Sequence, residues 1–105
     1  MAMDDRKKAF EDKYARDKEL QFKVGARRNK LLGLWAAEQM GLKGDAATTY
    51  AKSVIESDFE EAGDEDVFRK VMADLKAKKV DVSDHRLRKR MEELLTEARD
   101  QLMKE

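Results

Sequence analysis

The chain of 105 residues contains no cysteine and no proline, and only 7% of its residues are aromatic. Without cysteine it has no disulfide framework, thiolate nucleophile or cysteine-bound metal, and this composition fits a reducing cytoplasm. Without proline, no residue of that kind interrupts a helix. No apolar run approaches the roughly 18 residues that a membrane span needs, and the N-terminus lacks the apolar stretch of a secretory signal. We therefore expect a cytoplasmic protein that does not enter the membrane.

Charged residues are abundant instead. They make up 44% of the chain, and 23 bases balance 23 acids. A formal net charge of zero argues against electrostatic capture of nucleic acid or a membrane by the whole molecule. The charges are nevertheless segregated, because residues 20–37 carry four bases and no acid, whereas residues 53–68 carry seven acids and no base. The basic region is therefore able to complement the acidic one within the fold.

Apolar residues recur with helical spacing through nearly the whole chain. The length suits one compact domain. Caps and glycines divide the pattern: Asp45 and Ser83 are candidate N-caps, and glycines end the first two helices. The predicted helices span about residues 20–40, 45–62, 65–78 and 84–103. The expected fold class is all-α, a small four-helix bundle with a mobile N-terminal helical arm.

The first predicted helix contains the small residues Gly25, Gly33 and Ala37. A glycine inside a helix costs about 1 kcal/mol relative to alanine. We expect the compensation to be the close approach of a neighbouring helix. The single tryptophan, Trp35, is interpreted as an anchor of the core rather than as a platform for a ligand.

Residues 1–19 differ from the rest in having little apolar surface, with Phe10 and Tyr14 as their only aromatic residues. Acids placed four residues before bases favour a helix by a few tenths of a kcal/mol each. An isolated helix of this length is nevertheless marginal in water. We therefore predict an arm at residues 1–19 that orders on binding a partner, followed by the bundle at residues 20–105.

Two basic clusters suggest binding of phosphate or nucleic acid. The first comprises Arg27, Arg28 and Lys30, and the second lies within residues 86–90. For both, a solvated helix face is the favoured interpretation. The first cluster has a further alternative, which is to complement the acids of residues 56–66.

The sequence contains no motif typical of an enzyme. His85 is the only histidine, and a structural role in the first turn of a helix is favoured over catalysis. The acids of residues 56–66 do not have the spacing of an EF-hand loop. No phosphate-binding glycine loop, nucleophile elbow or zinc-protease motif occurs. We expect no catalysis, metal or cofactor, and these features alone indicate a helical interaction protein.

Four long segments carry a resemblance to a known family: AFEDKYARDKELQF (9–22), ARRNKLLGLWAAE (26–38), DFEEAGDEDVFRKV (58–71) and VSDHRLRKRMEELL (82–95). They resemble the zeta subunit family, small inhibitor subunits of bacterial F-type ATP synthases. The resemblance implies a four-helix fold whose N-terminal segment enters an α/β catalytic interface of the enzyme's head, near the central stalk. There it would block ATP hydrolysis. The implied partners are the α, β and γ subunits, and the implied location is peripheral to the membrane-bound enzyme.

The resemblance places the inhibitory segment on about residues 1–19, with Phe10, Lys13 and Tyr14 inside the matching stretch. The residues expected to contact the partner are Asp5, Arg6, Phe10, Lys13, Tyr14, Asp17, Phe22, Arg27 and Arg28. We expect a monomer when the protein is free. Composition alone leaves open an alternative, a small module that binds nucleic acid or senses nucleotides through its basic clusters.

Overall fold

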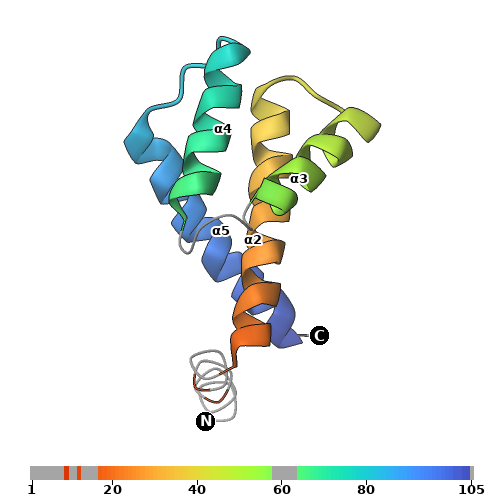
Figure 1. The fold of residues 1–105 in the computed structure, drawn as a ribbon, viewed down its shortest axis with the longest axis vertical. Coiled ribbons are helices and arrows are strands. Elements are labelled where there is room, and N and C mark those ends of the chain that lie inside the picture. Colours follow the sequence, from red (N-terminus) through yellow and green to blue (C-terminus); the bar gives the residue numbers. More distant parts are fainter. Residues whose placement is uncertain (1–8, 10–11, 13–16, 58–63, 105) are drawn as a thin grey trace.

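The structure is a computed structural model that describes Ala9, Asp12 and residues 17–57 and 64–104. These residues form four helices and no strand: α2 (Lys18–Gln39), α3 (Asp45–Ser57), α4 (Glu65–Ala77) and α5 (Asp84–Lys104) (Figure 1). The predicted all-α four-helix bundle is confirmed. The predicted mobility of the arm, and the end of the second helix at residue 62, lie outside the described residues. The division into residues 1–19 and 20–105 stays a prediction.

Side-chain caps determine where two of the helices begin. The Asp17 carboxylate accepts the backbone N–H groups two and three residues further on, at 3.0 and 3.3 Å, so α2 begins at Lys18, two residues earlier than predicted. The predicted cap at Ser83 is confirmed, because its Oγ accepts the N–H group three residues on at 3.1 Å. Asp45, expected as a cap, is instead the first residue of α3.

Left-handed residues end α2 and α4. The predicted turn after α2 contains Gly41 and Gly44, with φ of 78° and 57°, where a side chain would be strained. The N–H of Leu42 closes the helix end by donating to the Ala37 carbonyl at 2.8 Å. Lys79 takes the corresponding position after α4, with φ of 60°.

All four helices contribute to one core, and α2 packs against each of the other three. The buried side chains include Leu32 and Ala36 of α2, Val54 of α3, Val67, Phe68, Val71, Met72 and Leu75 of α4, and Leu87, Met91 and Leu94 of α5. Trp35, expected inside the core, is only partly buried and packs against its edge. None of the helices in the described part of the chain is both long enough and apolar enough to cross a membrane.

The close approach predicted from the small residues occurs between α2 and α3. A Cβ atom added to Gly33 would lie 2.5 Å from Cα of Ala51 and 3.0 Å from its Cβ. Real Cβ atoms do not come this close to a backbone atom, so the crossing requires glycine. This contact explains why a costly glycine lies in the middle of α2.

The helices differ in length, and this shapes the molecule. Figure 1 shows α3 and α4 beside the upper part of α2 and α5, while the N-terminal half of α2 and the C-terminal end of α5 extend beyond them. We call this two-helix extension the stem, defined as residues 18–28 of α2 and 95–104 of α5. The N-terminal segment joins the bundle at the stem.

Candidate functional site

The residues expected to contact a partner fall into two groups. Asp5, Arg6, Phe10, Lys13 and Tyr14 lie outside the described residues. Asp17, Phe22, Arg27 and Arg28 lie at the start of α2 and along its first half. In the segment before Asp17, the described residues Ala9 and Asp12 are helical and exposed.

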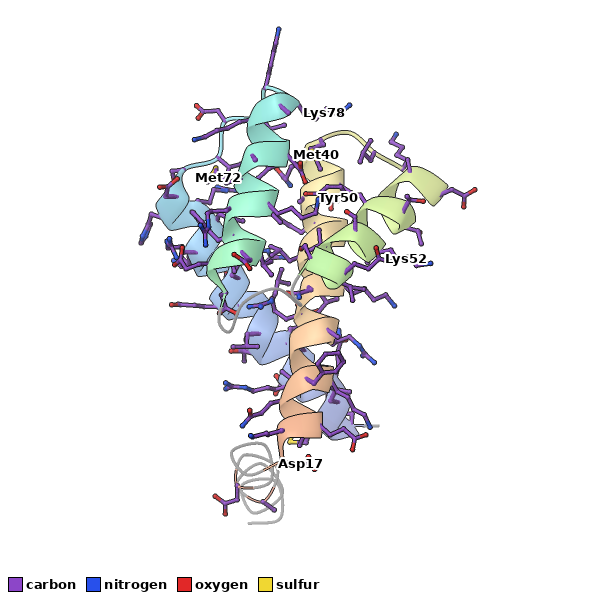
Figure 2. All side chains as sticks on the ribbon, viewed as in Figure 1. Asp17, Met40, Tyr50, Lys52, Met72 and Lys78 are labelled. Carbon is purple, nitrogen blue, oxygen red and sulfur yellow. The ribbon has the colours of Figure 1, made fainter. Side chains whose placement is uncertain are left out.

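Asp17 marks the junction between the N-terminal segment and the bundle (Figure 2). Its carboxylate caps α2, and its backbone carbonyl accepts the N–H of Gln21 at 3.0 Å. An N-cap of this kind is worth about 1 kcal/mol. The helix therefore begins firmly at the point where the N-terminal segment ends.

Phe22 lies in a groove of about 400 Å³ on the stem and is the most exposed large hydrophobic residue of the described chain, at 56%. We call this hollow the stem groove. The residues that line it are Phe22, Lys23, Ala26, Arg27 and Lys30 of α2, Ile55 of α3 and Leu102 of α5. Its apolar residues come from three helices, and its charged residues are all basic.

Arg27 forms the side of the groove towards α5. Its Nη1 donates to Oε1 of Gln101 at 2.9 Å, which fixes the guanidinium across the two helices of the stem. Lys23 has an ion pair with Glu19 at 3.6 Å, and both side chains are mostly exposed. An exposed pair of this kind is weak and is readily exchanged for another acid.

Arg28 has a different position from its neighbour, because it is only 2% exposed. Its Nη2 lies 2.8 Å from Oδ1 of Asp64, and its Nε donates to Oδ1 of Asn29 at 2.6 Å. The alternative in which the first basic cluster complements the acids of residues 56–66 therefore applies to Arg28. In this conformation its guanidinium holds the start of α4 against α2 and is not presented to a partner.

The second basic cluster is also partly engaged within the fold. Arg88 donates to both carboxylate oxygens of Glu65, at 2.9 and 3.3 Å, and its guanidinium lies 3.9 Å from the centre of the Phe68 ring. This hydrogen bond and the charge of Arg88 lower the pKa of the Glu65 carboxyl. Arg90 lies 6.0 Å from the centre of the Trp35 ring. A separate, mainly basic hollow of about 320 Å³ is lined by Trp35, Arg86, Lys89, Arg90 and Glu93.

The described residues give no support to a catalytic or metal site. His85 is exposed, and no group of three His, Cys, Asp or Glu side chains among the described residues is placed to hold a metal ion. Among the described residues, the pKa of Tyr50 is raised by burial and by its hydrogen bond to Asp74. That bond joins α3 to α4, away from the stem (Figure 2).

Comparison with known proteins identifies the family. The family described as ATPase inhibitor subunit zeta matches residues 1–101. The chain belongs to this family. Zeta-family membership supports a role as an inhibitor of ATP synthase, and it agrees with a regulatory rather than a catalytic protein.

A structure determined by NMR in solution has the same fold as this zeta-family chain. It is 50% identical in sequence, with a TM-score of 0.73, and the match covers 81% of this chain and 96% of the other. No curated protein matches the chain.

The sequence did not indicate the stem groove as a unit. Phe22 and Arg27 were expected at a partner surface, but Ile55 and Leu102 read as ordinary members of apolar helical stripes. Only the unequal lengths of the helices leave these side chains at an open edge. Neither periodicity nor composition reports where a neighbouring helix ends.

Proposed function

We propose that this protein inhibits ATP hydrolysis by the F-type ATP synthase by inserting its N-terminal segment, as a helix, into an α/β catalytic interface near the central stalk. The observation that carries the proposal is the zeta-family match, which begins at residue 1 and so includes that segment. The partners are the α, β and γ subunits of the catalytic head. The protein would act at the periphery of the membrane-bound enzyme and would perform no reaction itself.

The arrangement of the core supports separate roles for the N-terminal segment and the bundle. Among the described residues, the first buried hydrophobic side chain is Val24, so the core does not draw on Ala9 or Asp12, which are exposed. A segment that orders on binding loses roughly 2 to 5 kcal/mol. Burial of an aromatic side chain contributes about 1.5 to 3 kcal/mol, so Phe10 and Tyr14 together are sufficient to offset that loss.

The bundle gives the inserted helix a rigid base. Asp17 has an extended backbone and caps α2, so a helix bound in the cleft would be followed by a short break at Asp17 and then by the stem. In this proposal the bundle stays outside the cleft. It would remain on the outer surface of the head and oppose displacement of the segment by the turning stalk.

Removal of residues 1–16 should abolish inhibition. The test compares ATP hydrolysis by a cognate catalytic head, depleted of its own inhibitor, with the full chain and with a chain that begins at Asp17. The truncated chain keeps the cap of α2, and its helical circular dichroism and melting temperature serve as the folding control. Undiminished inhibition by the folded truncated chain would refute the proposed mechanism.

Phe10→Ala provides a finer version of the same test. Loss of a buried aromatic anchor should weaken inhibition at least tenfold, equivalent to about 1.4 kcal/mol. Leu34→Ala, at an exposed position of α2, is the matched control for loss of an apolar side chain. A lower melting temperature for Phe10→Ala would instead show that Phe10 belongs to the core.

The nucleic-acid alternative receives no comparable support. It requires the basic clusters to be available, yet Arg28 and Arg88 are paired with Asp64 and Glu65 within the bundle. Counterion release would make such binding fall steeply with salt concentration. No observation on the described residues favours it over the inhibitor role.

A further inference from the structure

We infer that the stem groove is a second docking surface, and that it binds an acidic segment bearing apolar side chains on the outer surface of the ATP synthase head. This inference rests on the proposed function, because it places the groove beside the cleft that receives the N-terminal segment. It goes further by assigning a separate site, built from three helices, and the chemistry of what that site binds.

The shape of the stem provides an apolar floor that the bundle leaves uncovered. The groove occupies about 400 Å³, and Ala26, Ile55 and Leu102 contribute to it together with Phe22, which is 56% exposed. An exposed aromatic side chain beside aliphatic residues from two other helices is an unfavourable surface in water, and such surfaces commonly mark interaction sites. Aromatic and arginine side chains are also enriched at the centres of protein interfaces.

The charge of the groove selects the kind of partner. Lys23, Arg27 and Lys30 line it, and no acidic side chain does so. Arg27 is held in place by Gln101 at 2.9 Å, so little side-chain freedom is lost when it meets a carboxylate. A segment with acids at its edges and apolar side chains at its centre would complement both features.

A second copy of this chain is a poor occupant. Among the described residues the longest run of acids is residues 64–66 at the start of α4, and all three of these acids already have ion pairs. Asp64 pairs with Arg28, Glu65 with Arg88 and Asp66 with Arg69. The chain's own residues 1–16 are also poorly suited, because they carry five bases against four acids and so have no net attraction to a basic groove.

The position of the groove indicates that its occupant is part of the same protein that binds the N-terminal segment. An α-helix rises 1.5 Å per residue, so Phe22 lies about 8 Å along α2 from Asp17, and Lys30 about 20 Å. Any surface that binds the segment therefore lies next to the groove. Two sites close together on one chain bind far more tightly than either alone, because the second contact forms at high effective concentration.

The test uses the full chain and measures two quantities on the cognate catalytic head: affinity and maximal inhibition at saturation. The first variant is Lys23→Glu/Lys30→Glu, and the second is Phe22→Ser. The matched control is Lys43→Glu/Lys79→Glu, which makes the same charge change at exposed positions outside the groove. Melting temperature confirms that each variant is folded.

We expect both groove variants to bind at least tenfold more weakly while still reaching full inhibition at saturation, and the control to bind like the original chain. The loss for the charge variant should shrink as salt is raised, because screening removes the electrostatic part. Unchanged affinity of the groove variants would overturn the inference. So would stronger inhibition by these variants, which would show that the chain's own segment occupies the groove.

The same measurements separate this inference from the proposed function. Unchanged affinity and full inhibition by Phe10→Ala/Tyr14→Ala, together with weak binding by the groove variants, would refute segment insertion and leave the groove as the main docking site. Sedimentation of the free chain tests the remaining occupant. A dimer that Lys23→Glu/Lys30→Glu converts to a monomer would assign the groove to a second copy and overturn the inference.

Discussion

Tyr50 shows how one polar side chain joins two helices at the edge of the core. Its hydroxyl donates to Oδ2 of Asp74 at 2.8 Å, and Nζ of Lys70 lies 3.1 Å from the same oxygen and 5.5 Å from the centre of the Tyr50 ring. Burial and the nearby carboxylate both disfavour the tyrosinate, so the pKa of Tyr50 is raised above its ordinary value. The folded state therefore retains this proton at a pH where the unfolded chain loses it.

Stability should consequently fall at alkaline pH through Tyr50. The contribution is fully present below the unfolded pKa of about 10 and is lost as pH rises above it, because only the unfolded state then gains by releasing the proton. Tyr50→Phe should cost about 1 kcal/mol at pH 7, for the lost hydrogen bond, and should reduce the alkaline decline. Denaturant unfolding between pH 7 and pH 11 checks this, with Tyr14→Phe as the matched control. Equal alkaline slopes for the original chain and Tyr50→Phe would contradict the assignment.

Gly33 and Arg28 show what a sequence reveals about single residues. A glycine inside a helix has a known cost, so a close helix crossing could be anticipated, and its contact with Ala51 confirms it. Arg28 could not be separated from Arg27 in the same way, because adjacent bases in a sequence look alike. Their surroundings are opposite, since Arg28 is 2% exposed and paired with Asp64, whereas Arg27 lines the stem groove.

At the scale of the elements, α2 contributes both to the packing of the bundle and to the proposed docking surface. It packs against the other three, presents Phe22 in the stem groove and begins at the cap residue Asp17, next to the N-terminal segment. The apolar periodicity predicted all four helices, because burial of one face decides helix formation more than propensity does. The start of α2 was missed by two residues, since the cap at Asp17 depends on backbone geometry that periodicity does not report.

Asp17→Ala should loosen the first turn of α2 and weaken inhibition. Loss of the carboxylate leaves the amides of Glu19 and Leu20 without their acceptor and costs about 1 kcal/mol locally. Faster hydrogen exchange at these two amides would report the fraying. Asp17→Ser, which retains a capping oxygen, is the matched control and should preserve both protection and inhibition. Undiminished protection in Asp17→Ala would show that other contacts fix the start of the helix.

At the scale of the whole molecule, the four-helix core and the proposed docking surface lie at different ends. Most of the large buried side chains gather where all four helices are present, whereas the two helices of the stem contain the fully buried Val24 and the exposed Phe22. The fold class followed from the sequence because four apolar stripes have few ways to pack. The groove did not, because it depends on which helices end early.

This unequal distribution should appear as a gradient of hydrogen exchange. Amides near Leu32, Val71 and Leu87, whose side chains are fully buried, should exchange only through global unfolding. Amides of residues 20–22 and 99–103 should exchange through local fraying, at lower free energy, because these ends of the two helices bury less apolar surface than the four-helix region. Binding to the catalytic head should then slow hydrogen exchange in the stem much more than in the four-helix region. The reason is that the stem contains the groove and is the point where the N-terminal segment joins the bundle. Equal slowing throughout the bundle would indicate general stabilisation instead and would place the contact with the enzyme elsewhere.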